Sequence, residues 1–316
     1  MRALSRASLA AAVFLVLLLQ PPLAFRSSAA DLVTIRIASS PADGIVPVLY
    51  AEQTGAFAKA GLDVSTIKMS GGAVVAGVLG GSIDVGKSSV VAIILAHAKG
   101  IPFQIVAPSA VYDPKTPDAV LGVKSDSPFR SAKDLSGQAI AVSTLGDISE
   151  VAIRSWFDQN GMDVRSAQLV EISISATAPA VEQGRVQAGV LIKPFITDAV
   201  DSGKERVLAP VYGAIAPRFL ESVYYGNRAY LDANRSSILA FKRVLEQSSR
   251  YVNVHLVETS GLLADFVGLD PQRAKTVSRI VTANTLDARD VQPVIDAMVR
   301  THMLDKPFDA REIIWH

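Results

Sequence analysis

Short apolar runs alternate with segments of helical spacing over the first two thirds of the chain. Residues 33–37 alternate apolar and polar positions with period two, which is typical of a half-buried strand. Strand-like runs are predicted at residues 33–37, 83–85, 103–106, 119–124, 138–142, 167–172, 187–192 and 205–209. Helical spacing is predicted over residues 46–54, 72–79, 88–99, 147–160, 177–184 and 194–202. This alternation of strands and helices predicts an α/β fold.

The character of the sequence changes after about residue 227, where the remaining segments all carry helical periodicity. Helices are predicted there over residues 227–256, 258–267, 271–282 and 290–304. The segment 107–118 holds three prolines and is expected to be a loop. A strand-rich middle followed by a helical tail fits a fold in which the chain leaves one lobe, builds a second and then returns to the first. The chain would cross between the lobes near residues 119–124 and 211–226. We therefore expect one lobe from residues 31–120 and 216–316, and a second lobe from residues 121–215.

Residues 1–30 have the organisation of a secretory signal peptide. Arg2 and Arg6 form its positive beginning, and residues 9–19 are an apolar run of eleven residues. A transmembrane helix needs about 20 apolar residues, so this run is short for a membrane span. Small residues end at Ala30, where we expect cleavage and release of a free periplasmic protein. An uncleaved N-terminal anchor is the alternative.

Composition and charge exclude several classes of protein. The chain has 316 residues, of which 49% are hydrophobic and 19% are charged, so it is not intrinsically disordered. Lys and Arg total 31 and Asp and Glu total 30, which leaves no basic excess for binding nucleic acid. Cysteine is absent, which excludes disulfides, thiol catalysis and lipidation at an N-terminal cysteine. The four histidines are dispersed, and we expect neither a metal nor a cofactor.

Gly81–Ser88 satisfies the pattern G-x-x-x-x-G-K-[ST] of a phosphate-binding loop. That loop needs a strand before its first glycine and irregular backbone between its glycines. Here the residues before Gly81 have helical spacing, and Ile83 and Val85 inside the motif alternate as in a strand. A nucleotide hydrolase is therefore disfavoured. No G-x-S-x-G or H-E-x-x-H pattern is present, and the chain is not expected to be an enzyme.

Polar turns follow several predicted strands, at the edge of the sheet where open α/β folds bind ligands. Backbone N–H groups at helix N-termini, with Ser and Thr hydroxyls, suit a small oxyanion. The candidate ligand residues in these turns are Ser39, Ser40, Asp43, Gly71, Gly72, Ser88, Ser89, Thr144, Asp147 and Lys193. A purely structural role stays open for each of these residues. Ser88 and Asp147 would then be ordinary N-caps, and Asp147 with Glu150 resembles a capping box. Lys87 and Lys193 would then be solvated lysines. Asp43 suits an anion site poorly.

Four segments resemble elements of the alkanesulfonate/taurine/nitrate-type substrate-binding proteins of bacterial ABC importers. Residues 55–64 (GAFAKAGLDV) resemble "G-x-F-x-x-x-G-L-x-V", and residues 78–86 (VLGGSIDVG) resemble "A-L-x-x-G-x-I-D-V-G". Residues 134–142 (DLSGQAIAV) resemble "D-L-x-G-K-x-I-A-V", and residues 181–188 (VEQGRVQA) resemble "A-L-x-x-G-x-V-D-A". These elements occur in the family's order over residues 33–210.

The resemblance implies a type II periplasmic binding protein fold, with two hinge-linked α/β lobes and a helical C-terminal region. It implies a ligand clamped between the lobes, delivery to a membrane permease, and a cleft that includes most of the candidate residues above. Gln187 replaces the family's usual Asp, whose role is expected to be structural. Lys193 replaces an acid found in many members, which favours an anionic ligand, so we expect a small sulfonate or carboxylate.

Three alternatives to this importer component stay open. A sensor of the same fold would report ligand to a membrane receptor, and a pyrimidine-precursor-type binding protein or synthase is less favoured. The nucleotide hydrolase ranks last. A monomer is expected, because the hinge has to open and close.

Overall fold

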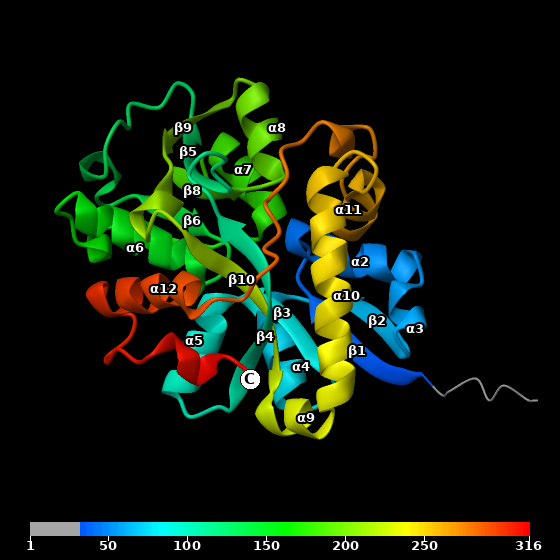
Figure 1. Cartoon of the computed structure of the whole chain (residues 1–316). Coiled ribbons are helices and arrows are strands. Elements are labelled where there is room, and N and C mark those ends of the chain that lie inside the picture. The colour runs from blue at the N-terminus through cyan, green and yellow to red at the C-terminus, as the bar shows by residue number, and fades with distance from the viewer. Residues whose placement is uncertain (1–31) are drawn as a thin grey trace, which may run out of the picture. The chain divides into compact units, whose positions relative to one another are not determined.

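Two five-stranded sheets, here called A and B, organise the computed structural model, which describes residues 32–316 (Figure 1). The predicted signal peptide, residues 1–30, lies outside the described residues. Sheet A has the order β2-β1-β3-β10-β4, with β1 (Val33–Ser39), β2 (Leu62–Lys68), β3 (Val85–Ser89), β4 (Phe103–Tyr112) and β10 (Phe219–Asn227). Sheet B has the order β7-β6-β8-β5-β9, with β5 (Ala119–Lys124), β6 (Ala139–Val142), β7 (Gln168–Glu171), β8 (Ala188–Ile192) and β9 (Glu205–Ala209).

The two sheets repeat one plan. In sheet A, β1 is parallel to β2 and β3, while β10 is antiparallel to β3 and β4. In sheet B, β6 is parallel to β7 and β8, while β5 is antiparallel to β8 and β9. The chain leaves sheet A after β4 and returns to it with β10. The predicted α/β class and two-lobed architecture are therefore confirmed.

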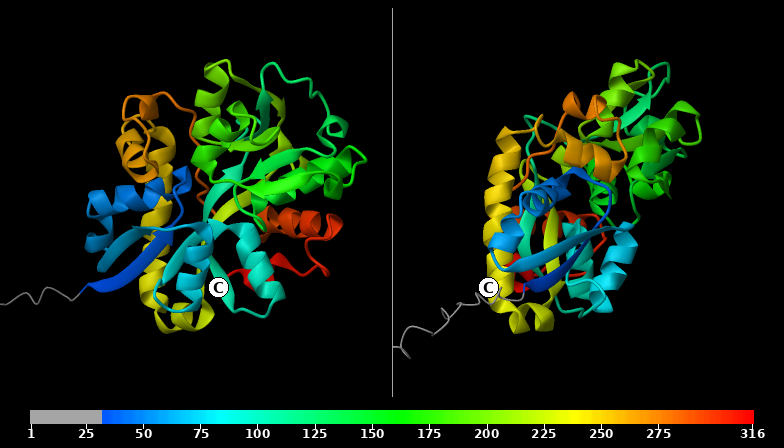
Figure 2. Two further views of the ribbon diagram at one scale, coloured as in Figure 1. Left: turned by 180° about the vertical axis from the view of Figure 1, so that it is seen from behind. Right: turned by 90° about the vertical axis from the view of Figure 1, so that its right-hand side faces the viewer.

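Helices cover both sheets (Figure 2). They are α2 (Val46–Gln53), α3 (Ala56–Lys59), α4 (Gly71–Leu79), α5 (Val90–Ala98), α6 (Ile148–Gln159), α7 (Ile174–Glu182), α8 (Phe195–Asp201), α9 (Arg228–Ala233), α10 (Arg235–Val254), α11 (Ser260–Val267) and α12 (Ala288–Arg300). The single-turn helices η1 (Asp43–Ile45) and η5 (Arg273–Lys275) lie in loops near the junction of the lobes. Within residues 32–316, no helix combines the length and apolarity that a membrane crossing requires.

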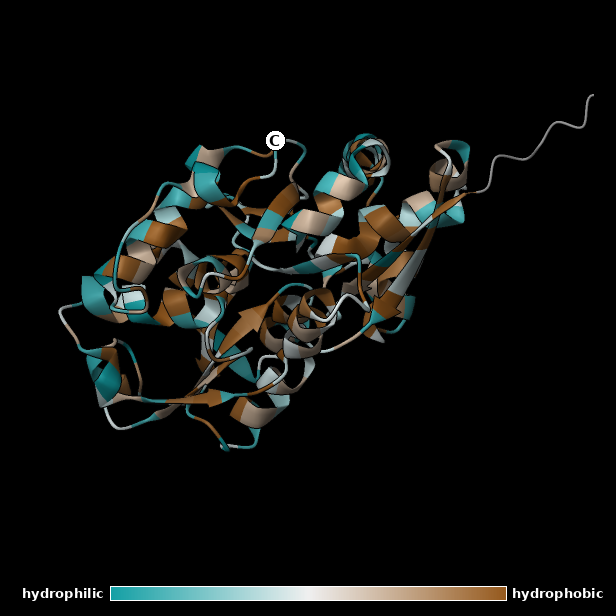
Figure 3. Cartoon of the chain, turned by 90° about the horizontal axis from the view of Figure 1, so that it is seen from below, coloured by the Kyte–Doolittle hydropathy of each residue, from teal (hydrophilic) through white to brown (hydrophobic). Residues whose placement is uncertain are grey.

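One apolar cluster runs through both lobes. It joins Ile105 of sheet A to Leu121 of sheet B, and both side chains are fully buried. Helix α12 packs against α5 of one lobe and α6 of the other, with Val291 and Ile295 in the cluster. Figure 3 shows largely apolar strands among helices whose outer faces are polar. The two lobes therefore share part of their core. Burial of each such side chain stabilises the folded state by about 1.5–3 kcal/mol.

The predicted loop 107–118 is wrong in its first half, because β4 continues to Tyr112 with every residue buried. Pro108 has no N–H to donate, and it lies at a register irregularity opposite Val223 of β10. Strands tolerate proline at such irregularities. Pro108 therefore does not end the strand, and the other two prolines of the segment follow its end at Tyr112.

The predicted helix 271–282 is also wrong. Only η5 is helical there, and the chain then runs along the free edge of β4. The N–H of Val111 donates to the carbonyl of Val281 (3.2 Å), and the N–H of Ala283 donates to the carbonyl of Ser109 (2.9 Å). Residues 276–282 are rich in Val, Ile and Thr, which suit an extended chain.

Asp84 and Gln187 occupy equivalent places in the two lobes, before β3 and β8. Asp84 Oδ2 accepts the backbone N–H of Arg36 (2.8 Å), and both of its carboxylate oxygens bind the Arg36 guanidinium. Gln187 Oε1 accepts the backbone N–H of Ala139 (3.2 Å). Each side chain ties the start of one parallel strand to its neighbour, so the departure at Gln187 keeps a structural contact.

We expect Asp84→Ala to lower the free energy of unfolding by about 1–3 kcal/mol, because it leaves the part-buried N–H groups of Arg36 without their acceptor. Urea unfolding followed by circular dichroism measures the change. Asp63→Ala, at an exposed position on β2, is the matched control and should change stability by less than about 0.5 kcal/mol. Equal effects of the two variants would contradict a structural role for Asp84.

Candidate ligand-binding site

The carboxyl ends of strands from the two sheets meet at a buried junction. Lys193 follows β8 of sheet B, and its Nζ donates to the carbonyl of Arg279 (3.2 Å). The Arg279 guanidinium in turn binds Asp43, which follows β1 of sheet A. Gly146, after β6, approaches helix α5 of the other lobe, because a Cβ on it would lie 3.6 Å from Leu95 Cδ1. The turns after β1 and β8 are therefore linked through Arg279.

Asp43 is fully engaged within the protein. Its Oδ1 accepts from Arg279 Nε (2.8 Å) and Nη2 (2.6 Å), and its Oδ2 accepts from Arg279 Nε (2.7 Å) and the backbone N–H of Ile280 (3.0 Å). Both charged side chains are almost completely buried. Asp43 therefore fixes the segment after η5 to the end of β1.

Lys193 forms the second buried ion pair. Its Nζ donates to Asp118 Oδ1 (2.9 Å) and to the carbonyls of Thr116 (3.1 Å) and Arg279 (3.2 Å). The Lys193 side chain is 4% exposed and the Asp118 side chain is fully buried, so the interpretation of Lys193 as a solvated lysine is wrong. With three acceptors, this ammonium group joins the end of β8 in sheet B to the segment before β5 and to the segment after η5.

Glu221 of β10 lies beside the second pair and is also buried. Its Oε1 has no hydrogen-bond partner among the described residues. Burial, and then the neighbouring charge of Asp118, raise the pKa of Glu221 well above its ordinary value. Its charged form is therefore disfavoured at this position.

Lys87 is the third basic side chain of the junction. It is 5% exposed, so the solvated interpretation fails here as well. Burial lowers the pKa of its ammonium group to about 8, while Asp43 and then Glu221 act in the opposite direction. The junction thus gathers Lys87, Lys193 and Arg279 in one water-poor region.

The predicted hydroxyl residues lie around these strand ends in different states. Ser39 Oγ donates to the carbonyl of Ser40 (2.8 Å), and Thr144 Oγ1 donates to the carbonyl of Ser143 (2.7 Å). Ser40 and Ser88 are half-buried, and their hydroxyls have no hydrogen bond to any described residue. These two hydroxyls are therefore available to a ligand.

Local capping explains several of the predicted residues. Ser89, rather than Ser88, caps α5 by accepting the N–H of Val91 (3.3 Å). Asp147 caps α6 by accepting the N–H of Ser149 (2.9 Å), as the alternative interpretation held. Glu150 accepts the N–H of Gly146 (2.7 Å) instead of the N–H of Asp147, so no standard capping box forms. Burial raises the pKa of Asp147, and hydrogen bonds from Ser143 and Ser149 oppose that shift.

Two segments that the sequence predicts as turns, residues 70–72 and 87–89, lie largely in a helix and in a strand. Gly71 and Gly72 are the first residues of α4, whose N-cap Ser70 makes no side-chain capping bond. Lys87, Ser88 and Ser89 lie within β3 rather than after it. The phosphate-loop pattern follows helix α4 and not a strand, as predicted, so it lacks the preceding strand of a phosphate loop. The predicted strand 83–85 is shifted, because residues 82–84 between the two glycines are irregular and β3 begins at Val85.

Sequence reasoning missed Asp118, Glu221 and Arg279. Asp118 stands directly before an apolar strand, and Arg279 interrupts an apolar, β-branched run; both are weak signals of a buried charge. Glu221 lies in residues 211–226, for which the sequence predicts only a crossing between the two lobes. The partners of these residues are far away in the sequence, so local patterns do not reveal the pairs.

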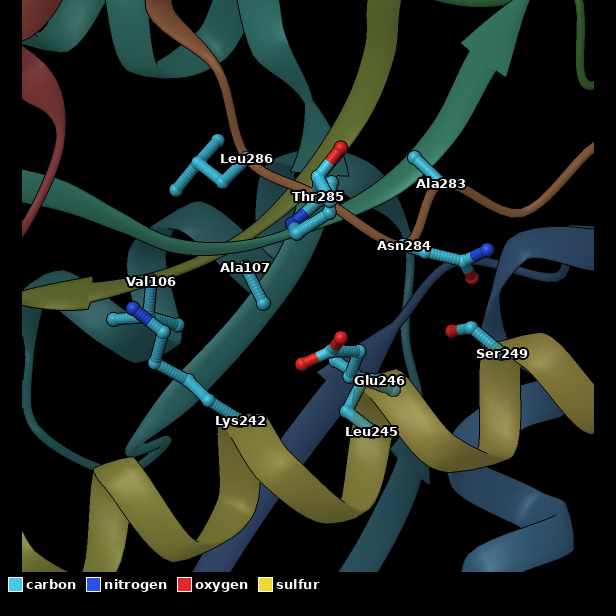
Figure 4. A pocket seen from close by; sticks show the side chains of 11 residues that line it. Val106, Ala107, Lys242, Leu245, Glu246, Ser249, Ala283, Asn284, Thr285 and Leu286 are labelled. Carbon is cyan, nitrogen blue, oxygen red and sulfur yellow. The ribbon is translucent and has the colours of Figure 1, made fainter.

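A separate pocket of about 300 Å³ lies between α10, β4 and residues 283–286 (Figure 4). Lys242 and Glu246 of α10 line one side, and Asn284 and Thr285 line the other. None of the predicted ligand residues contributes to it. It is therefore distinct from the junction.

The profile of the family described as NMT1/THI5 like matches residues 43–255, which is more than half of the chain. This chain belongs to the NMT1/THI5-like family. Membership agrees with the resemblance that the four sequence elements indicated. No curated protein sequence matches the chain.

Several solved structures share the fold of this chain. The periplasmic aliphatic sulphonate binding protein SsuA from Escherichia coli superposes with a TM-score of 0.71 at 22% identity, over 90% of this chain and 92% of that chain. The alkanesulfonate-binding protein SsuA from Xanthomonas axonopodis pv. citri, bound to MOPS, gives 0.74 at 20% identity, over 90% and 99%. The Candida albicans CA3427 gene product, described as having the generic periplasmic binding protein fold, gives 0.71 at 17% identity, over 90% and 96%.

We expect Lys193→Met to destabilise this NMT1/THI5-like protein by about 3–5 kcal/mol, because Asp118 then stays buried without its counter-charge. Chemical unfolding of Lys193→Met, Asp118→Asn and the double variant measures the coupling between the two residues. The double variant should lose less stability than the sum of the single variants. Additive losses would contradict a coupled ion pair.

Proposed function

We propose that this protein is a periplasmic solute-binding protein of an ABC importer. It captures a small organic anion, of sulfonate or carboxylate type, between its two lobes and delivers the anion to the permease. The observation that carries the proposal is the junction at which strand ends of both sheets converge on three buried basic side chains. Arg279 and Lys193 are paired with acids there, and Lys87 has no acidic partner within residues 32–316. Buried positive charge in a water-poor region selects for a ligand that brings negative charge.

The fold relatives support the class of ligand. The two SsuA proteins are named as sulfonate-binding proteins, and one of them was crystallised with MOPS, which carries a sulfonate group. At 20–22% identity they support the kind of function, and the cargo of this chain is inferred from its own junction.

The lobes would act as a clamp. Lobe 1 comprises residues 31–120 and 216–316, and lobe 2 comprises residues 121–215. A ligand that contacts both lobes favours the closed state, because its affinity for that state is higher. The chain makes and breaks no bond in this cycle and works as a monomer, released into the periplasm by cleavage after Ala30. The proposed ligand contacts are Ser39, Ser40, Gly71, Gly72, Ser88, Ser89, Thr144 and Asp147. Asp43 and Lys193, which the sequence also suggested, are engaged in buried ion pairs and shape the site without touching the ligand.

We expect thermal unfolding of residues 31–316 to shift upward with at least one anion of a defined panel. The panel contains butanesulfonate, taurine, benzenesulfonate, benzoate, nitrate and Mg-ATP. An anion present at 100 times its Kd stabilises the folded state by about 2.7 kcal/mol, which is a clear shift.

Butanesulfonamide and benzenesulfonamide are the matched neutral controls, and they should give smaller shifts than the sulfonates. A shift with Mg-ATP alone would contradict the proposal and revive the nucleotide interpretation. Saturable binding of the neutral amides with no binding of any anion would contradict the anionic cargo.

A further inference from the structure

Lys87 lies in the centre of sheet A, between two strands that hold it in place. It pairs with Ser39 of β1 and with Tyr224 of β10. Its side chain extends over η1, where a Cβ on Gly44 would lie 3.0 Å from Lys87 Cε and 3.2 Å from Nζ. Glycine at position 44 therefore leaves the space that the ammonium group occupies.

No hydrogen bond joins Lys87 Nζ to any residue of the described chain, although the side chain is only 5% exposed. The hydroxyls beside it have another acceptor: Ser109 Oγ (3.0 Å) and Tyr224 Oη (2.8 Å) both donate to the carbonyl of Gly44. Asp43, the nearest acid on η1, is engaged by Arg279. Nζ is not among the completely buried unpartnered atoms, so it can still be reached from solvent. A nearly buried ammonium group without a protein partner is costly and calls for an explanation.

Lys87 differs from the other two basic side chains of the junction in its partners. Asp43 is paired with Arg279, and Asp118 is paired with Lys193. Burial and the neighbouring charge of Asp118 raise the pKa of Glu221, which disfavours its charged form. No ion pair joins Lys87 to an acid within residues 32–316. A negatively charged group from outside the chain would supply the partner that Lys87 lacks.

We propose that Lys87 is the residue that pairs with the anionic group of the ligand and thereby favours a negatively charged ligand over a neutral one. The proposal rests on the proposed function, and it names which of the three basic side chains meets the ligand. Ser88 follows Lys87 within β3 and its side chain points to the opposite face of the sheet, so the charge of Lys87 alone carries this proposal.

Lys87→Met tests the proposal, because methionine keeps most of the volume and removes the charge. The probes are benzenesulfonate with benzenesulfonamide, and butanesulfonate with butanesulfonamide, measured by isothermal titration. We expect Lys87→Met to bind the sulfonates about tenfold to hundredfold more weakly than the unmodified protein, as for loss of a charged hydrogen bond. Affinity for the sulfonamides should stay unchanged.

The unliganded protein supplies a second readout. Lys87→Met should melt at the same or a higher temperature than the unmodified protein, because it removes an uncompensated buried charge. Lys133→Met, at an exposed position, is the control and should change neither melting nor binding. A lower melting temperature of Lys87→Met would contradict the proposal and indicate that the ammonium group is structural.

The outcomes separate this inference from the proposed function. Undiminished sulfonate affinity in Lys87→Met would overturn the role of Lys87 and leave the binding-protein function standing. Failure of the unmodified protein to bind any anion of the panel would overturn both.

Discussion

The structure depends on how charges are compensated where the two sheets meet. Buried charges are tolerated only when they are paired and hydrogen-bonded, because removal of their water is costly. The pairs Asp43–Arg279 and Asp118–Lys193 meet this condition, and the carbonyl of Arg279 links them. They connect the end of β1, the crossing before β5, the end of β8 and the C-terminal segment. A polar junction replaces apolar packing where a ligand has to enter.

Apolar packing holds the lobes together elsewhere. Helix α12 contacts α5 and α6, so the shared cluster forms a continuous support on one side of the junction. Polar contacts link the lobes near η5, where Arg273 binds Asp198 and Asp201 of α8, and where Thr197 Oγ1 accepts the N–H of Ser278 (3.3 Å). Exposed ion pairs of this kind contribute little and exchange readily with water. The apolar side therefore suits a hinge, and the polar side suits opening.

Local patterns predicted the elements whose signals are local. The helix at 147–160 and the strand at 119–124 correspond closely to α6 and β5. The extended segment after η5 and the strand β10 were missed, because their pairing with β4 joins residues distant in sequence. The same limit applies to the site: the turns were predicted, but Asp43 and Arg279 are 236 positions apart. Lys87 drew attention through a nucleotide motif, and only its burial without a partner indicated a different role.

The central claim is that an anion closes the two lobes, and a distance between the lobes tests it most directly. The chain has no cysteine, so Gln53→Cys and Gln183→Cys, both at exposed positions, allow specific spin labelling of lobe 1 and lobe 2. Pulsed electron–electron double resonance spectroscopy then gives the distribution of distances between the two spin labels, with and without benzenesulfonate or butanesulfonate. The account predicts that a saturating sulfonate narrows the distribution and shifts it to a single closed distance. An unchanged distribution in the presence of bound sulfonate would contradict it.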